Sequence, residues 1–169
     1  MSALRVYSDP LQHAAIAAAV VAPLGRNAVR TAVAAALIID VDHAVAARSV
    51  RIRATTGLDT RPRTHSIVTA LAASAAVGVL GGRVQGWAAF AGLVSHLLHD
   101  AGDQAAPTPM LWPLAPARQL GRKRQAAGTV LLALGSLALS RRAAAAASSS
   151  PSAAACADGD GASARPRTA

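Results

Sequence analysis

The segment GLVSHLLHDAGD at residues 92–103 ends an apolar run with two histidines and two aspartates. His96 and Asp100 are four residues apart, so in a helix they lie on one face and can point at a common centre. Neutral imidazole and carboxylate are the ligands that zinc accepts when thiolates are absent. The pair therefore has two interpretations: one wall of a metal site, or a hydrogen-bonded His–Asp pair at a helix end.

The same residue types stand beside three other apolar runs. His13 begins the first run, Asp40 and Asp42 in DVDH end the second, and His65 begins the third. His65 follows Thr64 at an expected helix start, where the positive end of the helix dipole favours the neutral imidazole that a metal requires. Taken singly, each of these residues could equally cap a helix or lie at a membrane interface.

The composition favours helices and limits the chemistry. The chain has 169 residues, of which 53% are hydrophobic, many of them alanine, and only 2% are aromatic. Alanine is the best helix former, and the aromatic residues that favour strands are scarce. The single cysteine, Cys156, excludes an intrachain disulfide and a cysteine-based zinc cluster.

Five apolar runs define the expected helices: 13–24, 31–40, 66–82, 84–100 and 126–140. Breaks at Pro23 and Gly25, and at the glycine pair 81–82, predict two helical hairpins, and the last run predicts a further apolar helix. Polar, basic connections occupy 41–65 and 102–125. From residue 143 onward Ala, Ser, Pro and Gly predict disorder. The sequence thus predicts an all-α domain at 1–142 and a disordered tail at 143–169.

The apolar runs favour a membrane protein. Each is roughly 18 residues or shorter, slightly less than the roughly 20 of a full span. The runs at 66–82 and 126–140 are nevertheless apolar all round, as membrane helices are, and a small soluble domain could hardly cover them. Burial in a soluble protein is the alternative, but a multi-pass inner-membrane protein is the favoured prediction.

The arginines indicate the orientation. If the helices alternate in direction, the N-terminus and the connections 41–65 and 102–125 lie on one side. That side carries most of the basic residues, namely Arg5, Arg48, Arg51, Arg53, Arg61, Arg63, Arg118, Arg122, Lys123 and Arg124. The opposite side carries Arg26, Arg30, Arg83, Arg141 and Arg142. The positive-inside rule therefore places the two long connections in the cytoplasm.

The same topology gathers the candidate ligands at the cytoplasmic boundary. His13, Asp40, Asp42, His65, His96 and Asp100 all fall there, which predicts a divalent metal site, with zinc as the expected metal. Asp40 or Asp42 could act as general base, and Arg61 and Arg63 could hold an anionic group near the membrane. His43, His99 and Asp103 are expected to be outer partners or solvated.

Four motifs occur in this order: IIDVDH (38–43), RPRTHS (61–66), SHLLHD (95–100) and LWPL (111–114). In order and spacing they resemble the bacterial membrane-bound metal-dependent hydrolases of the LexA-regulated inner-membrane type, which are themselves similar to zinc-dependent phospholipase C and nuclease P1. The resemblance covers about residues 10–140. It implies a cytoplasm-facing hydrolase-like site whose ligands are the same six residues. No histidine follows His99, so it implies one or two metals rather than three.

The sequence therefore predicts a membrane-bound metal-dependent hydrolase of phosphoesters, with a membrane lipid as one candidate substrate. The alternative is a non-catalytic membrane protein whose His/Asp cluster is structural or only binds metal. The net charge of +9 raises the possibility of nucleic-acid binding. That function is disfavoured because stacking aromatics are lacking and the arginines are divided among loops and a tail. The sequence leaves the substrate and the oligomeric state open.

Overall fold

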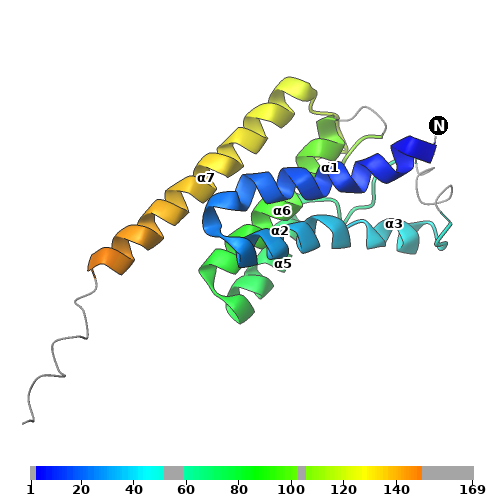
Figure 1. The fold of residues 1–169 in the computed structure, drawn as a ribbon. Helices are drawn as coiled ribbons and strands as arrows, with labels where there is room; N and C mark the ends of the chain where they lie inside the picture. The colour runs from blue at the N-terminus through cyan, green and yellow to red at the C-terminus, as the bar shows by residue number, and fades with distance from the viewer. Residues whose placement is uncertain (1–2, 52–58, 103–105, 150–169) are drawn as a thin grey trace, which may run out of the picture.

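The computed structural model describes residues 3–51, 59–102 and 106–149, and within them it is an all-α protein with no strand. Its helices are α1 (Ala3–Val21), the 3₁₀ turn η1 (Ala22–Leu24), α2 (Arg26–Ile38), α3 (Val41–Ala46), α5 (Ile67–Gly81), α6 (Arg83–Gly102) and α7 (Arg122–Ser149) (Figure 1). The predicted fold class, two helical hairpins plus a further apolar helix, is confirmed.

Both hairpins turn at a glycine with a left-handed backbone. The first turns at Gly25, between η1 and α2, with a φ of 89°. The second turns at Gly82, between α5 and α6, with a φ of 85°. Side chains other than glycine strongly disfavour this conformation, so both turns are fixed by the sequence. Each hairpin brings its chain back to the end from which it started.

The connection 41–65 contains a short helix that the sequence interpretation missed. Ile39 and Asp40, which follow α2, keep right-handed helical dihedrals, and α3 then runs from Val41 to Ala46. The DVDH motif therefore lies at a bend between two nearly continuous helices rather than in a loop. This geometry lets Asp40 and His43 turn toward the same centre.

The last helix is longer than predicted. The apolar run at 126–140 suggested an end near residue 142, but α7 continues through Ser149. The alanines at 143–147 extend it, because alanine has the highest helix propensity even where its run resembles a low-complexity tail. Residues 150–169 of the predicted tail, including Cys156, lie outside the described residues. In Figure 1, α7 extends beyond the end of the bundle at which the two hairpins turn.

α6 forms the centre of the bundle, and small residues let its neighbours approach closely. From Ala88 to Gly102 it is buried almost throughout. α2 presents Ala28, Ala32 and Ala36 as one buried stripe at intervals of four residues. At Gly92 the backbones meet so closely that an added Cβ would lie 2.8 Å from Ala32 Cα. Tight packing of α2 on α6 fixes the position of Asp40 relative to His96.

Two helices expose apolar side chains to the outside. α5 buries only Ala70 and Ser74, and α7 buries only Leu132 and Ser136. Their large exposed apolar residues include Val68, Leu71, Val79, Leu80, Val130, Leu131 and Leu134. Among the described helices, α7 alone is long and apolar enough to cross a membrane, and Ile67–Gly81 is a shorter apolar helix.

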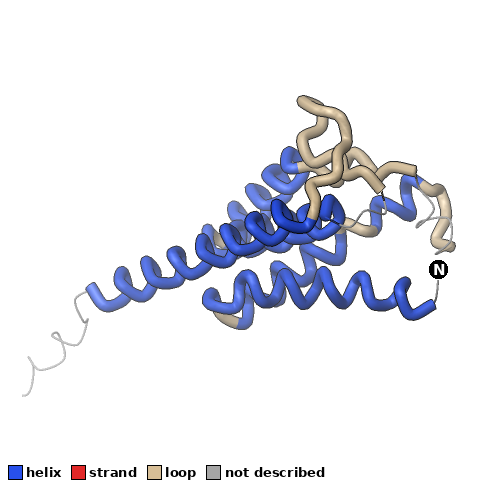
Figure 2. The backbone as a smooth tube through the Cα atoms, turned by 90° about the horizontal axis from the view of Figure 1, so that it is seen from above, coloured by secondary structure: helices blue, strands red, loops and turns tan. Residues whose placement is uncertain are grey.

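The long connections gather at one end of the bundle, beside the N-terminal part of α1 (Figure 2). Three backbone hydrogen bonds attach the 106–121 loop to that end. Arg61 donates to Pro107, Ile67 to Met110 at 2.8 Å, and Leu120 to Ala101 at 2.8 Å. The loop thus packs over the start of α5 and the end of α6. We refer to this end of the bundle as the site end.

Candidate metal centre

Four donor atoms from three parts of the chain meet at the site end: Asp40 Oδ1 before α3, His65 Nε2 before α5, and His96 Nε2 and Asp100 Oδ2 on α6. His96 Nε2 lies 3.3 Å from each of the two carboxylate oxygens. His65 Nε2 lies 3.4 Å from Asp100 Oδ2 and 3.9 Å from Asp40 Oδ1. Ligands of a tetrahedral zinc stand roughly 3.3–3.6 Å apart. Three of these spacings match that range, and the fourth is slightly longer.

Hydrogen bonding does not account for this cluster. His65, His96 and Asp100 are at most 1% exposed. The Nε2 atoms of both histidines and Oδ2 of Asp100 meet no hydrogen-bond geometry among the described residues, and Oδ1 of Asp100 has an ion pair with Arg61 at 3.1 Å. Each such group costs about 1–3 kcal/mol when buried without a partner. A simple His–Asp pair was the alternative for His96 and Asp100, and their Nε2 and Oδ2 atoms lie 3.3 Å apart, at ion-pair distance. Two buried imidazoles and the buried carboxylate of Asp100, with the partly exposed carboxylate of Asp40 beside them, fit a divalent cation.

Asp42 lies behind His65 rather than among the four donors. Its Oδ2 is 3.0 Å from Nδ1 of His65 and also accepts a hydrogen bond from the Thr64 hydroxyl. Burial raises the pKa of Asp42, but the hydrogen bonds from His65 and Thr64 outweigh this effect and hold it below its usual value. An ionised Asp42 keeps the proton of His65 on Nδ1, which leaves Nε2 with a free lone pair.

Local sequence explains how His65 reaches this position. Ser66 caps α5, because its hydroxyl accepts a hydrogen bond from the backbone N–H of Thr69. His65 therefore stands immediately before the cap, at the start of the helix, with Thr64 and Asp42 on its far side. The THS motif thus combines a ligand candidate, its orienting partner and a helix cap.

Replacing Asp42 with asparagine is expected to weaken metal binding without removing a ligand. Outer carboxylates that orient a metal-bound histidine typically contribute 10–100-fold to affinity, so we expect a loss of about that size. Competition with a chelator of known affinity measures it. Asp59→Asn is the matched control, because Asp59 is an exposed carboxylate outside the cluster. Equal affinities for the two variants would contradict the orienting role.

His43 adds a further imidazole to this side of the cluster. Asp40, His43 and His65 each offer one ligand atom, and these atoms lie within 4.8 Å of one another. Burial lowers the pKa of His43, and the nearby His65 and Arg61 lower it further. His43 is therefore neutral at pH 7, as a metal ligand must be. The sequence interpretation had treated it as an outer or solvated residue.

The two arginines predicted to bind an anion have different surroundings. Arg61 is mostly buried, and its Nη2 lies 3.1 Å from Asp100 Oδ1, directly against the cluster. Arg63 is exposed, and its guanidinium lies 5.8 Å from the centre of the Trp112 ring. Of the two, Arg61 alone is in contact with the donor set.

A second group of donors lies beside the first. Asp9, His13 and His99 each offer one atom within 4.8 Å of the others. The ring of His13 also stacks on that of His96, with centroids 3.7 Å apart. The structure thus brings all six predicted ligands to one end and adds three residues that the ligand prediction omitted, Asp9, His43 and His99. Asp103 lies outside the described residues.

Sequence alone contained a signal for Asp9. It stands four residues before His13, so both lie on one face of a helix. The apolar run starts only at His13, and the helix was therefore expected to begin there. α1 in fact begins at Ala3 and tolerates Pro10 within it.

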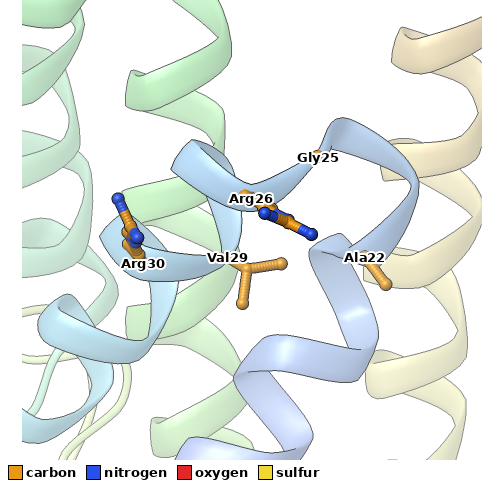
Figure 3. Close-up of a pocket in the computed structure, with 5 residues that line it drawn as sticks. All are labelled: Ala22, Gly25, Arg26, Val29 and Arg30. Atoms are coloured by element: carbon orange, nitrogen blue, oxygen red, sulfur yellow. The ribbon is translucent and has the colours of Figure 1, made fainter.

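The opposite end of the bundle has different chemistry. A shallow pocket of about 350 Å³ lies between η1 and the start of α2, lined by Ala22, Gly25, Arg26, Val29 and Arg30 (Figure 3). It contains two basic side chains but neither a histidine nor a carboxylate. This pocket therefore offers no carboxylate or imidazole for acid–base or metal chemistry.

A family model described as YdjM inner membrane protein matches residues 9–157. The chain belongs to the YdjM inner membrane protein family. The match begins at Asp9 and includes every residue of both donor groups. No curated protein and no solved structure matches the chain. The family is one of inner-membrane proteins, and among the described helices α7 is long and apolar enough to cross a membrane.

Proposed function

We propose that this YdjM-family protein is a membrane-bound metal-dependent hydrolase of phosphoesters. The observation that carries the proposal is the buried set of His65, His96, Asp40 and Asp100, whose spacings suit one tetrahedral ion. Zinc is the best candidate, because it accepts imidazole and carboxylate ligands in this geometry. The motif resemblance to membrane-bound metal-dependent hydrolases supports the same activity.

Residues of the chain itself would supply proton transfer and substrate binding in the proposed reaction. A bound divalent metal would supply Lewis acidity, which eases the deprotonation of water and polarises a phosphoryl oxygen. Asp40 is 34% exposed, so substrate and water can approach on its side, and its carboxylate can accept a proton. Asp42 is engaged with His65 and Thr64, so between the two aspartates Asp40 is the better general base. Arg61 can hold an anionic oxygen of the substrate.

The surroundings of the site favour a substrate carried by the membrane. Large apolar side chains are exposed around the site end, at Val45 and Val50 after α2 and at Leu111 and Leu114 in the 106–121 loop. Exposed apolar residues, together with the arginines of the two long connections, suit the headgroup region of an anionic bilayer. A phospholipid is therefore the substrate class that we propose first.

We also propose a multi-pass topology with the site end facing the cytoplasm. The exposed apolar faces of α5 and α7 support contact with lipid, and the excess of arginine at the site end supports the orientation. Labelling a cysteine introduced at Asp59, in a chain that also carries Cys156→Ser, with a membrane-impermeant reagent tests it. We expect labelling in inverted inner-membrane vesicles only, and labelling in intact spheroplasts would contradict the orientation.

Hydrolysis assays test the function. Purified protein with zinc is expected to hydrolyse bis-p-nitrophenyl phosphate or phosphatidylglycerol in vesicles, to lose activity with a chelator and to regain it with zinc. Arg61→Gln should lower the rate about tenfold or more, whereas Arg63→Gln, two residues away, should change it little. Preference for the vesicle substrate would support the lipid assignment. Bound metal without hydrolysis of either substrate would contradict the proposal and favour the non-catalytic alternative.

A further inference from the structure

The two carboxylate oxygens of Asp100 face different sets of histidines. Oδ2 lies 3.4 Å from His65 Nε2 and 3.3 Å from His96 Nε2. Oδ1 points to the other side, where it lies 3.5 Å from His13 Nε2. Asp100 is 1% exposed, and among the described residues its contacts with these histidines and with Arg61 are ion pairs, none of which meets hydrogen-bond geometry. One buried carboxylate thus serves two separate groups of donors.

The second group is complete enough to hold an ion of its own. Asp9 Oδ1 lies 3.6 Å from His13 Nε2 and 3.7 Å from His99 Nε2, so it stands between two imidazole nitrogens. His13 is 1% exposed. The side-chain amide of Gln125 on α7 contacts His99 Nδ1 at 3.2 Å. That contact holds the ring with Nε2 facing Asp9. Binding of a cation through Nε2 requires the proton on Nδ1, with the Gln125 amide turned so that its oxygen accepts from Nδ1–H.

The charge at the site end also calls for more than one divalent cation. Four carboxylates belong to the two groups or orient them: Asp9, Asp40, Asp42 and Asp100. Arg61 is the one cation of fixed charge that forms an ion pair with them among the described residues. Counting only these four carboxylates, Arg61 and neutral histidines, one divalent ion would leave a net negative charge within the cluster, which disfavours an anionic group there. Two would leave a net positive charge, which attracts it.

We propose that Asp100 bridges two divalent cations, one held with Asp40, His65 and His96, the second with Asp9, His13 and His99. This inference rests on the proposed function, because the second site shares Asp100 with the first centre. Arg61 Nη2 lies 3.1 Å from the bridging Oδ1. This is compatible with a second ion, because a carboxylate oxygen has two lone pairs and can bind a cation and accept from Arg61 together.

Metal counting on the full-length protein tests the proposal. Protein purified in detergent, loaded with Zn²⁺ and freed of excess ion is expected to hold about two metals per chain. Asp9→Asn and His99→Gln are each expected to hold about one, and Asp59→Asn, an exposed control, about two. One metal per chain in the wild type would overturn the second site and leave the proposed hydrolase centre standing. No metal in the wild type would overturn both.

A second measurement on the wild type does not depend on how the variants fold. X-ray absorption of the zinc-loaded protein is expected to show a metal–metal vector of about 3.5–4 Å, the separation typical of two-metal hydrolytic sites. The same vector should be absent from His99→Gln. Its absence from the wild type, or two metals retained by both Asp9→Asn and His99→Gln, would overturn the bridge.

Discussion

Replacing Asp100 with asparagine is expected to remove most of the bound metal and reduce hydrolysis to background. The amide keeps the shape of the side chain but loses the charge, and only this carboxylate contacts both groups of histidines. Loss of an outer carboxylate costs about 10–100-fold in metal affinity, and loss of this direct ligand should cost more. Metal content and the rate of phosphodiester hydrolysis measure the effect.

Asp59→Asn is the control for Asp100→Asn, since it removes an equal charge from the exposed loop. Circular dichroism of both variants checks that the helices persist. An Asp100→Asn protein that is folded and retains wild-type metal content would show that Asp100 is not a ligand. That result would remove both the first centre and the proposed bridge.

Replacing Gly92 with alanine is expected to destabilise the fold and disturb the site together. The added Cβ would overlap the carbonyl oxygen of Ala32, which belongs to rigid backbone and cannot rotate away. α2 must then separate from α6, and Asp40 must shift from its position 3.3 Å from His96. Overpacking of this kind costs about 1–3 kcal/mol, so the melting temperature and metal affinity should both fall.

Gly78→Ala provides the matched comparison for Gly92→Ala. Its Cβ would lie 3.5 Å from Gly86 Cα, an ordinary van der Waals contact. Because alanine has the higher helix propensity, this variant should be as stable as the wild type or slightly more stable. Equal melting temperatures for Gly78→Ala and Gly92→Ala would contradict close packing of α2 on α6 as the feature that positions the site.

The candidate ligands gather at one end of the bundle because of the order and direction of the helices, which could be predicted from the sequence. Gly25 and Gly82 turn each hairpin, so the chain returns to one end after every second helix. Residues in the first helix of one hairpin and in the second helix of the other can then share that end, as His13 on α1 and His96 on α6 do. No side-chain detail is needed for this inference, and the predicted hairpins are confirmed.

The individual roles required information that spacing does not provide. Asp40 and Asp42 are two residues apart and chemically identical, yet one faces His96 and the other lies behind His65. Arg61 and Arg63 are also two residues apart and chemically identical, yet one contacts Asp100 and the other lies over the Trp112 ring. Distances between elements that are remote in sequence decide such cases.

The central claim is that His65 and His96 hold a divalent metal at the site end. Elemental analysis of purified wild-type protein, His65→Ala and His96→Ala tests it most directly. We expect metal in stoichiometric amount in the wild type and a loss of at least one equivalent in each variant. Equal metal content in all three proteins, or none in the wild type, would contradict the claim.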